Sequence, residues 1–240
     1  MQKYKKVKKT IYTHPISNRY LTDVVFKVQV SLLVTLVINM IYIGINLFLG
    51  IYYDSVWFIA LAIYYMLLSL MRFMLFNHTK SNKQTDIISQ YKRYRWCGVF
   101  LLVITLILSG IMVLVIKNRE GYSYNGMLIY GMAAYTFYIF TLSIINMVKY
   151  KKYNSPVLSA SKVVNFVAAL MSMLALETAM LSQFGEQNKN PHFEEIMLGS
   201  TGAVICVTIV VIAIFMLRKS TKEINKTKKL RRFIHGKKQF

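Results

Sequence analysis

The uncharged segment "CGVFLLVITLILSGIMVLVI", Cys97 to Ile116, decides the class of fold. A helix needs about 20 mainly apolar residues to cross the roughly 30 Å hydrocarbon core of a bilayer. Working outward along the chain, five more segments show the same pattern. The sequence therefore predicts an all-α fold, a polytopic membrane helix bundle of six transmembrane helices, at residues 24–50, 53–76, 96–117, 123–148, 157–184 and 194–218.

The composition supports this class and argues against several others. Of 240 residues, 55% are hydrophobic and 16% are charged, with a mean hydropathy of +0.43, whereas about a quarter of a soluble chain is charged. The net charge of +21 would suggest nucleic acid in a soluble protein, but here the basic residues lie between and beyond the spans. We expect no nucleic-acid partner, no cofactor and no metal, and the different depths of Cys97 and Cys206 argue against a disulfide.

Charge also predicts topology. Lysine and arginine are concentrated before the first span, after the second, after the fourth and after the sixth, whereas acidic residues predominate at the opposite ends. Cytoplasmic loops carry the excess of basic residues, so both termini should be cytoplasmic. We therefore expect a basic cytoplasmic leader at 1–23, a transmembrane domain at 24–218 and a basic cytoplasmic tail at 219–240.

The leader and the tail interleave basic with apolar residues, as segments that bind anionic lipid headgroups do. The alternative is that these charges only fix the topology. The residues expected to contact anionic lipid are Lys5, Lys6, Lys8, Lys9, Lys228, Lys229, Arg231 and Arg232.

The spacing of the spans predicts three hairpins, which pair the first helix with the second, the third with the fourth and the fifth with the sixth. Ser155 and Pro156 are typical of a helix N-cap and its first residue, and Pro191 repeats the device before the sixth span. Small residues recur along the last two helices and predict that these two pack tightly. They are Ala168, Ser172, Ala175, Ala179 and Ser182 on one helix and Gly199, Gly202, Ala203, Cys206 and Ala213 on the other.

The segment "SMLALETAML", Ser172 to Leu181, places a single carboxylate, Glu177, within the fifth span. A lipid-facing ionised carboxylate would cost several kcal/mol. We therefore expect a central fifth helix, with Glu177 as a neutral acid that donates a hydrogen bond. Candidate partners at its depth are Tyr42, Ser109, Gly110, Tyr130, Gly131 and Thr201. A functional version adds that the group exchanges a proton or meets a cation; a structural role remains the alternative.

Polar residues also form stripes on the first two helices. Ser31, Thr35, Asn39, Tyr42 and Asn46 share a face of the first, and Ser55, Phe58, Ala62, Tyr65, Ser69 and Arg72 share a face of the second. Such stripes either join helices through hydrogen bonds or line a cavity. We expect Arg72 to extend to the headgroups, and a depth difference of roughly 16 Å excludes a direct pair with Glu177.

Several stretches resemble an uncharacterised family of bacterial six-span integral membrane proteins with no assigned activity. They are "YYDSVWFIALAIYYMLLSLMRF", "GMAAYTFY", "NSPVLSASK" and "SMLALETAMLSQFG". The resemblance covers most of the chain apart from its basic ends. It implies a bacterial plasma membrane and assigns no site.

The sequence is compatible with two classes of function and disfavours a third. The first is a small-solute or ion permease with an intramembrane carboxylate as its coupling or binding group, with candidate residues Glu177, Tyr42, Asn39, Asn46 and Tyr130. The alternative is a non-transporting membrane scaffold or accessory subunit that acts through its basic cytoplasmic ends. An intramembrane enzyme is disfavoured, because the interiors of the spans, away from their ends, hold no histidine, one acid and one arginine, too few groups for a convergent catalytic set.

Overall fold

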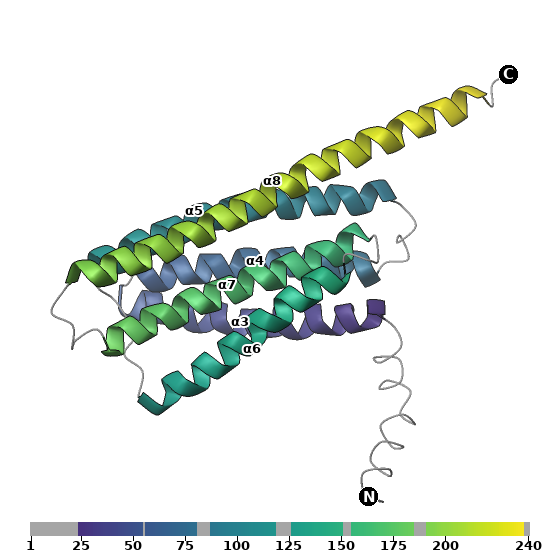
Figure 1. The fold of residues 1–240 in the computed structure, drawn as a ribbon. Coiled ribbons are helices and arrows are strands. Elements are labelled where there is room, and N and C mark those ends of the chain that lie inside the picture. The colour runs from purple at the N-terminus through teal and green to yellow at the C-terminus, as the bar shows by residue number, and fades with distance from the viewer. Residues whose placement is uncertain are drawn as a thin grey trace, which may run out of the picture.

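The computed structural model describes residues 24–54, 56–80, 87–118, 126–150, 155–184 and 191–237. In these ranges the chain is all-helical, and each helix is long and apolar enough to cross a membrane (Figure 1). The helices are α3 (Val24–Tyr52), α4 (Val56–Lys80), α5 (Ile87–Asn118), α6 (Gly126–Tyr150), α7 (Pro156–Phe184) and α8 (Pro191–Lys237). The prediction of an all-α chain with six candidate spans is confirmed.

Two helices extend well beyond their apolar segments. α5 begins at Ile87 rather than near residue 96, and α8 continues past residue 218 to Lys237, with no break where the tail was predicted to begin (Figure 1). The extra residues include many lysines and arginines, which have good helix propensity. An apolar run therefore marks the part of a helix that can lie in hydrocarbon, but the helix itself can continue beyond that run. The proposed leader at 1–23 lies outside the described residues.

The helix ends follow the predicted local chemistry. α7 begins at Pro156, and the Ser159 amide donates to the Ser155 carbonyl at 3.0 Å. α8 begins at Pro191. Between α3 and α4 the Tyr53 amide donates to the Leu49 carbonyl at 2.9 Å, after which Asp54 has a φ of 48°, a left-handed conformation that aspartate tolerates.

Gly50, in the last turn of α3, lies so close to α4 that there is no room for a side chain. A Cβ at this position would lie 2.8 Å from Cγ1 of Ile59 on α4. The close approach of the two helices at this end requires glycine.

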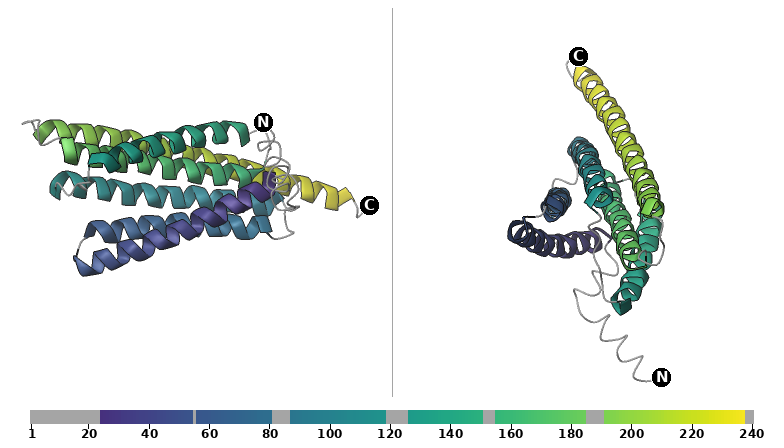
Figure 2. Two further views of the ribbon diagram at one scale, coloured as in Figure 1. Left: turned by 90° about the horizontal axis from the view of Figure 1, so that it is seen from below. Right: turned by 90° about the vertical axis from the view of Figure 1, so that its left-hand side faces the viewer.

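The helices pair differently from the predicted hairpins. α3 does pack along α4, but α5 packs along α8, and α6 packs along α7 (Figure 2). The predicted pairs of the third with the fourth helix and of the fifth with the sixth are therefore wrong. α7 contacts all five of the other helices, so the expectation of a central fifth helix is confirmed.

Glycines at the interface between α5 and α8 explain why α8 pairs with α5 and not, as predicted, mainly with α7. A Cβ on Gly202 of α8 would lie 2.5 Å from Cε of Met112 on α5, and one on Gly98 of α5 would lie 3.2 Å from the Leu217 side chain of α8. The small residues of α8 thus let it approach α5 closely, although α8 also contacts α7. A small-residue face predicts a close contact, but it does not say which helix makes it.

One continuous apolar core joins these helices, with residues of α3, α4, α5, α7 and α8 buried in it. Large apolar side chains also point outward, among them Phe48, Leu106 and Val204. An outer surface of this kind is typical of a helix bundle in lipid, and it agrees with the six candidate spans.

Candidate functional site

Three contacts fix how α3 and α4 lie against each other. Near one end the Gln29 side chain donates to the Thr79 carbonyl at 2.8 Å, and further along the rings of Tyr42 and Tyr65 stack with centroids 5.2 Å apart. Between them Arg72 donates to the Thr35 carbonyl at 3.1 Å. This antiparallel register brings Thr35 opposite Arg72 and Tyr42 opposite Tyr65, so these residues of the two polar stripes meet. Ser55, the first residue of the α4 stripe, lies outside the described residues.

Arg72 lies inside the bundle, not at its surface. The side chain is only 4% exposed. Its Nη1 donates to the Thr35 carbonyl of α3, and its Nη2 lies 3.5 Å from Oδ1 of Asn165 on α7, near the outer limit of a hydrogen bond. The expectation that Arg72 extends to the headgroups is wrong, because acceptors from two neighbouring helices hold the guanidinium where α3, α4 and α7 meet.

Four buried polar atoms on α3 and α4 have no hydrogen-bond partner: Nε of Arg72, Oγ of Ser69, Nδ2 of Asn39 and the hydroxyl of Tyr64. Asn39 is one helical turn after Thr35, whose carbonyl accepts from Arg72. Ser69 is one helical turn from Arg72, and Tyr64 is close enough to interact electrostatically with the guanidinium. We call Arg72, Ser69, Asn39 and Tyr64 the Arg72 cluster. Leaving a buried donor unpaired costs about 1–3 kcal/mol, so the cluster is incomplete as a purely structural network.

The predicted residues of α3 lie beside this cluster. Asn39 and Asn46 are both buried, and Nδ2 of Asn46 donates to the Tyr42 carbonyl of its own helix at 2.8 Å. Tyr42 itself stacks on Tyr65 of α4. The structure therefore brings Asn39, Tyr42 and Asn46 together along the α3–α4 interface.

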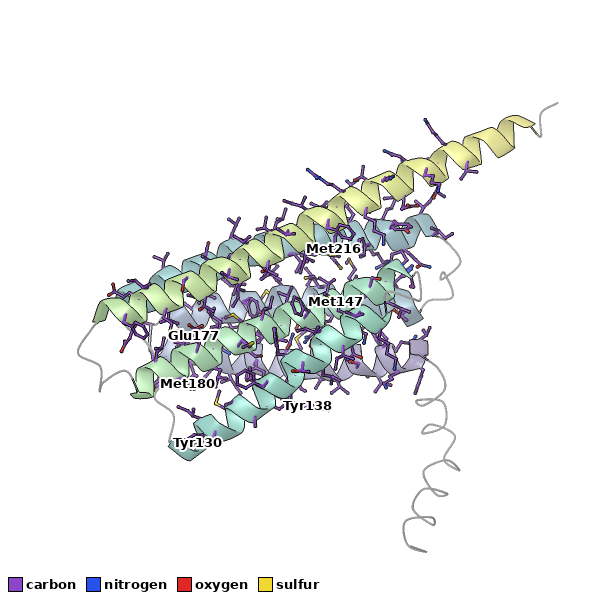
Figure 3. All side chains as sticks on the ribbon, viewed as in Figure 1. Tyr130, Tyr138, Met147, Glu177, Met180 and Met216 are labelled. Carbon is purple, nitrogen blue, oxygen red and sulfur yellow. The ribbon has the colours of Figure 1, made fainter. Side chains whose placement is uncertain are left out.

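Glu177 lies elsewhere, between α7 and α8 (Figure 3). The Thr201 hydroxyl of α8 donates to its Oε1 at 2.9 Å. Thr201 was among the predicted partners and is confirmed, but in this contact the carboxyl oxygen accepts the hydrogen bond. Glu177 follows Asn165 by about 18 Å along α7, and no ion pair joins it to Arg72 in the described part of the chain.

The other candidate residues are not part of this interior. Tyr130 is 68% exposed near the start of α6, a helix that packs mainly on α7 (Figure 3). Lys228 and Lys229 are exposed on the extension of α8. Side chains of the remaining lipid-contact candidates, Lys5, Lys6, Lys8, Lys9, Arg231 and Arg232, lie outside the described residues.

Sequence reasoning missed Asn165 and Tyr64, and it assigned Arg72 to the surface. A signal was present: Asn165 is an amide within an otherwise apolar part of α7, in "KVVNFVAAL". Buried polar residues in a span are usually paired with one another. An arginine and an asparagine in two different spans therefore indicated a contact that reading each helix separately could not show.

A cleft opens at the end of the bundle where α3, α5 and α7 begin and where α8 continues outward; we call this the basic end. The cleft has a volume of about 610 Å³. Gln90 and Tyr91 of α5, the first turn of α7, and Glu223 and Lys226 of α8 contribute to its lining. The extension of α8 thus forms one wall of a partly open, mixed-charge surface.

Comparison with protein-family models, with curated proteins and with solved structures gives no match to the chain. The site is therefore interpreted from its own geometry.

Proposed function

We propose that the chain is a small-solute or ion permease of a bacterial plasma membrane, with both termini cytoplasmic. The observation that supports this most is the Arg72 cluster, a charged and unsatisfied group of donors inside an apolar bundle. An intramembrane ionisable residue is by default a candidate for function. The buried asparagines of α3, Asn39 and Asn46, extend the cluster along the bundle and would form one wall of the solute path, with the 47% exposed Tyr42 at its edge.

The proposed movement is of the α3–α4 pair against α7. α3 and α4 pack closely on each other and each contacts α7 far less; α4 also packs on α5, where Arg93 donates to the Met74 carbonyl at 3.1 Å. The long contact between Arg72 and Asn165 is therefore one of few polar links across this boundary. A pair of helices that moves as a unit would expose the cluster first to one side and then to the other, without a broken helix.

Glu177 is proposed as the coupling group. It lies on the same helix as Asn165 but contacts α8, so α7 carries both sites. Loss or gain of a proton at Glu177 would change the contact with Thr201 and shift α7. That shift would reach the Arg72 cluster through Asn165.

In this proposal residues 24–218 form the transmembrane domain, and residues 1–23 and 219–240 are the basic cytoplasmic leader and tail. The bilayer is the main partner. The leader and tail lysines and arginines would contact anionic headgroups, each contributing about 1 kcal/mol near the surface.

The test is solute uptake by the purified chain in proteoliposomes, with Asn39→Leu as the site variant and Tyr130→Phe as the control. We expect at least one solute to enter faster than in protein-free vesicles, Asn39→Leu to reduce that rate at least tenfold, and Tyr130→Phe to leave it unchanged. Glu177→Gln should remove the dependence of uptake on a proton gradient. Uptake equal to that of empty vesicles for all inorganic ions, carboxylates, amino acids and sugars would overturn the proposal.

A second candidate, a scaffold or accessory subunit, is favoured by the extension of α8 and the cleft beside it. A rigid, basic helix that continues beyond the bundle offers a surface to a protein partner. The test compares the full chain with a variant that ends at Leu230, by cross-linking in native membranes. A stoichiometric partner lost on truncation, together with no uptake of any solute, would favour the scaffold over the permease.

A further inference from the structure

We infer that the Arg72 cluster is a binding site for a small monovalent anion, held between α3, α4 and α7. The inference deepens the proposed function by naming the class of solute, but its test is a binding measurement that does not require flux. Charge and hydrogen-bonding capacity support it, and the enclosure of the cluster limits the size of the ligand.

Charge is the first reason. Arginine stays protonated in proteins. Arg72 is almost fully buried, and no carboxylate of the described residues pairs with it; its two hydrogen-bond partners are the Thr35 carbonyl and the Asn165 amide oxygen, both neutral. A buried cation without a counter-ion is costly, so one negative charge beside it would be strongly favoured.

Hydrogen-bonding capacity gives the same answer. Two of the unpaired atoms, Nε of Arg72 and Nδ2 of Asn39, can only donate, and the hydroxyls of Ser69 and Tyr64 can donate as well. A cation would meet a guanidinium and a set of donors, which cannot coordinate it. A neutral solute would leave the charge uncompensated. An anion supplies acceptors and charge together.

The geometry also limits the size of the ligand. Nη1 and Nη2 each have a partner, on α3 and α7, so these contacts orient the guanidinium, and Nε is its nitrogen without any partner, available to the ligand. The four unpaired atoms are enclosed by the surrounding helices. A site of this kind fits a halide, nitrate or a small carboxylate better than a phosphorylated molecule. Entry requires the same separation of the α3–α4 pair from α7 that transport would use.

The experiment measures the Tm of the full chain in detergent at constant ionic strength, with gluconate replaced stepwise by chloride, bromide, nitrate, formate or acetate. We expect a saturable rise in Tm with at least one of these ions, because a ligand that binds only the folded state stabilises it. Exchanging sodium for potassium should have no effect. Arg72→Met should abolish the rise, whereas Arg218→Met, which removes an exposed arginine, should retain it.

Ser69→Ala keeps the charge and removes one donor, so it tests the site even if Arg72→Met does not fold. We expect it to weaken the apparent affinity by about 10- to 100-fold, the effect of one hydrogen bond to a charged group. A rise in Tm of equal size in wild type, Arg72→Met and Ser69→Ala would overturn the inference. The absence of a rise with every anion would overturn it too. In either case the cluster would hold only water.

The two proposals can fail separately. If anion binding is saturable and depends on Arg72 but no solute is taken up, the permease proposal is wrong and the anion-binding site stands. Uptake of a cation or a neutral solute, with no effect of anions on Tm, would overturn the anion site and leave the permease.

Discussion

The interface between α5 and α8 is built from small and apolar side chains, whereas the junction of α3, α4 and α7 is built around a guanidinium. In the first, Gly98 and Gly202 let the helices approach closely, and Oγ of Ser220 donates to the Tyr91 carbonyl at 2.6 Å. In the second, four polar atoms are buried without partners. Both regions lie in the same bundle and are shielded to a similar degree.

The difference between these two regions indicates that one is built for helix packing and the other for binding. A membrane interface of small residues needs nothing beyond its two helices, because close contact and a few hydrogen bonds stabilise it. A partly satisfied polar network is less stable than an apolar core of the same size. The α3–α4–α7 junction therefore makes physical sense as a place that a ligand completes.

The largest effect is expected from filling the α5–α8 contact. Gly202→Leu should lower the free energy of unfolding by about 2–3 kcal/mol, because its side chain would overlap Met112. Reversible unfolding in mixed detergent micelles measures this. The control is Gly110→Leu on α5, where a Cβ meets nothing within 4 Å, and the change should stay below about 0.5 kcal/mol. Equal losses in the two variants would mean that the α5–α8 contact is not tightly packed.

A smaller effect is expected where α8 is tied to α5 by a side chain. Ser220→Ala should cost about 1 kcal/mol, since it removes a buried hydrogen bond to the Tyr91 carbonyl. Ser200→Ala is the matched variant, because the exposed Ser200 bonds only to Met197 within its own helix. The same unfolding measurement compares them, and a loss no larger than that of Ser200→Ala would contradict the prediction.

The Glu177 contact lies between the two regions and should contribute less. Thr201→Val removes the hydroxyl that donates to Glu177 and should cost about 0.6 kcal/mol, the average for such bonds between membrane helices. Thr208→Val on the same helix removes only a bond to Val204 of its own turn and serves as the control. If Thr208→Val destabilises the protein as much, the α7–α8 hydrogen bond contributes nothing to stability.

The smallest effect is expected at the charged junction itself. In buffer whose only anion is gluconate, Arg72→Met should change the free energy of unfolding by less than about 0.5 kcal/mol, because the loss of two hydrogen bonds is offset by removal of a buried charge. A loss above about 3 kcal/mol would show that the guanidinium holds α3, α4 and α7 together, and the contrast between the two regions would disappear.

Sequence reasoning located the helices but not their neighbours. Apolar length found all six, and Ser155 with Pro156 placed the start of α7, because both signals are local. The choice of α5 as the partner of α8 depends on how side chains such as Met112 fill the space beside Gly202, which no single helix reveals.

The same distinction applies to the candidate site. Thr201 could be found as a partner of Glu177 because depth in the membrane limits which residues can meet. Arg72 was placed at the surface because its position along α4 gives its depth but not its direction. Its direction is set by the Thr35 carbonyl and Asn165, which belong to two other helices.

The unbroken length of α8 has a mechanical consequence. The 47-residue helix is about 70 Å long, and about 28 Å of it follows Arg218 (Figure 1). The Ser220–Tyr91 hydrogen bond and the buried Ile224 still hold this part of α8 against the bundle, so the pivot of the arm lies near Ile224. A change of about 10° in the tilt of the helix beyond it would move the far end of the arm by about 3 Å. The arm thus amplifies small rearrangements of the bundle into displacements large enough for another molecule to detect.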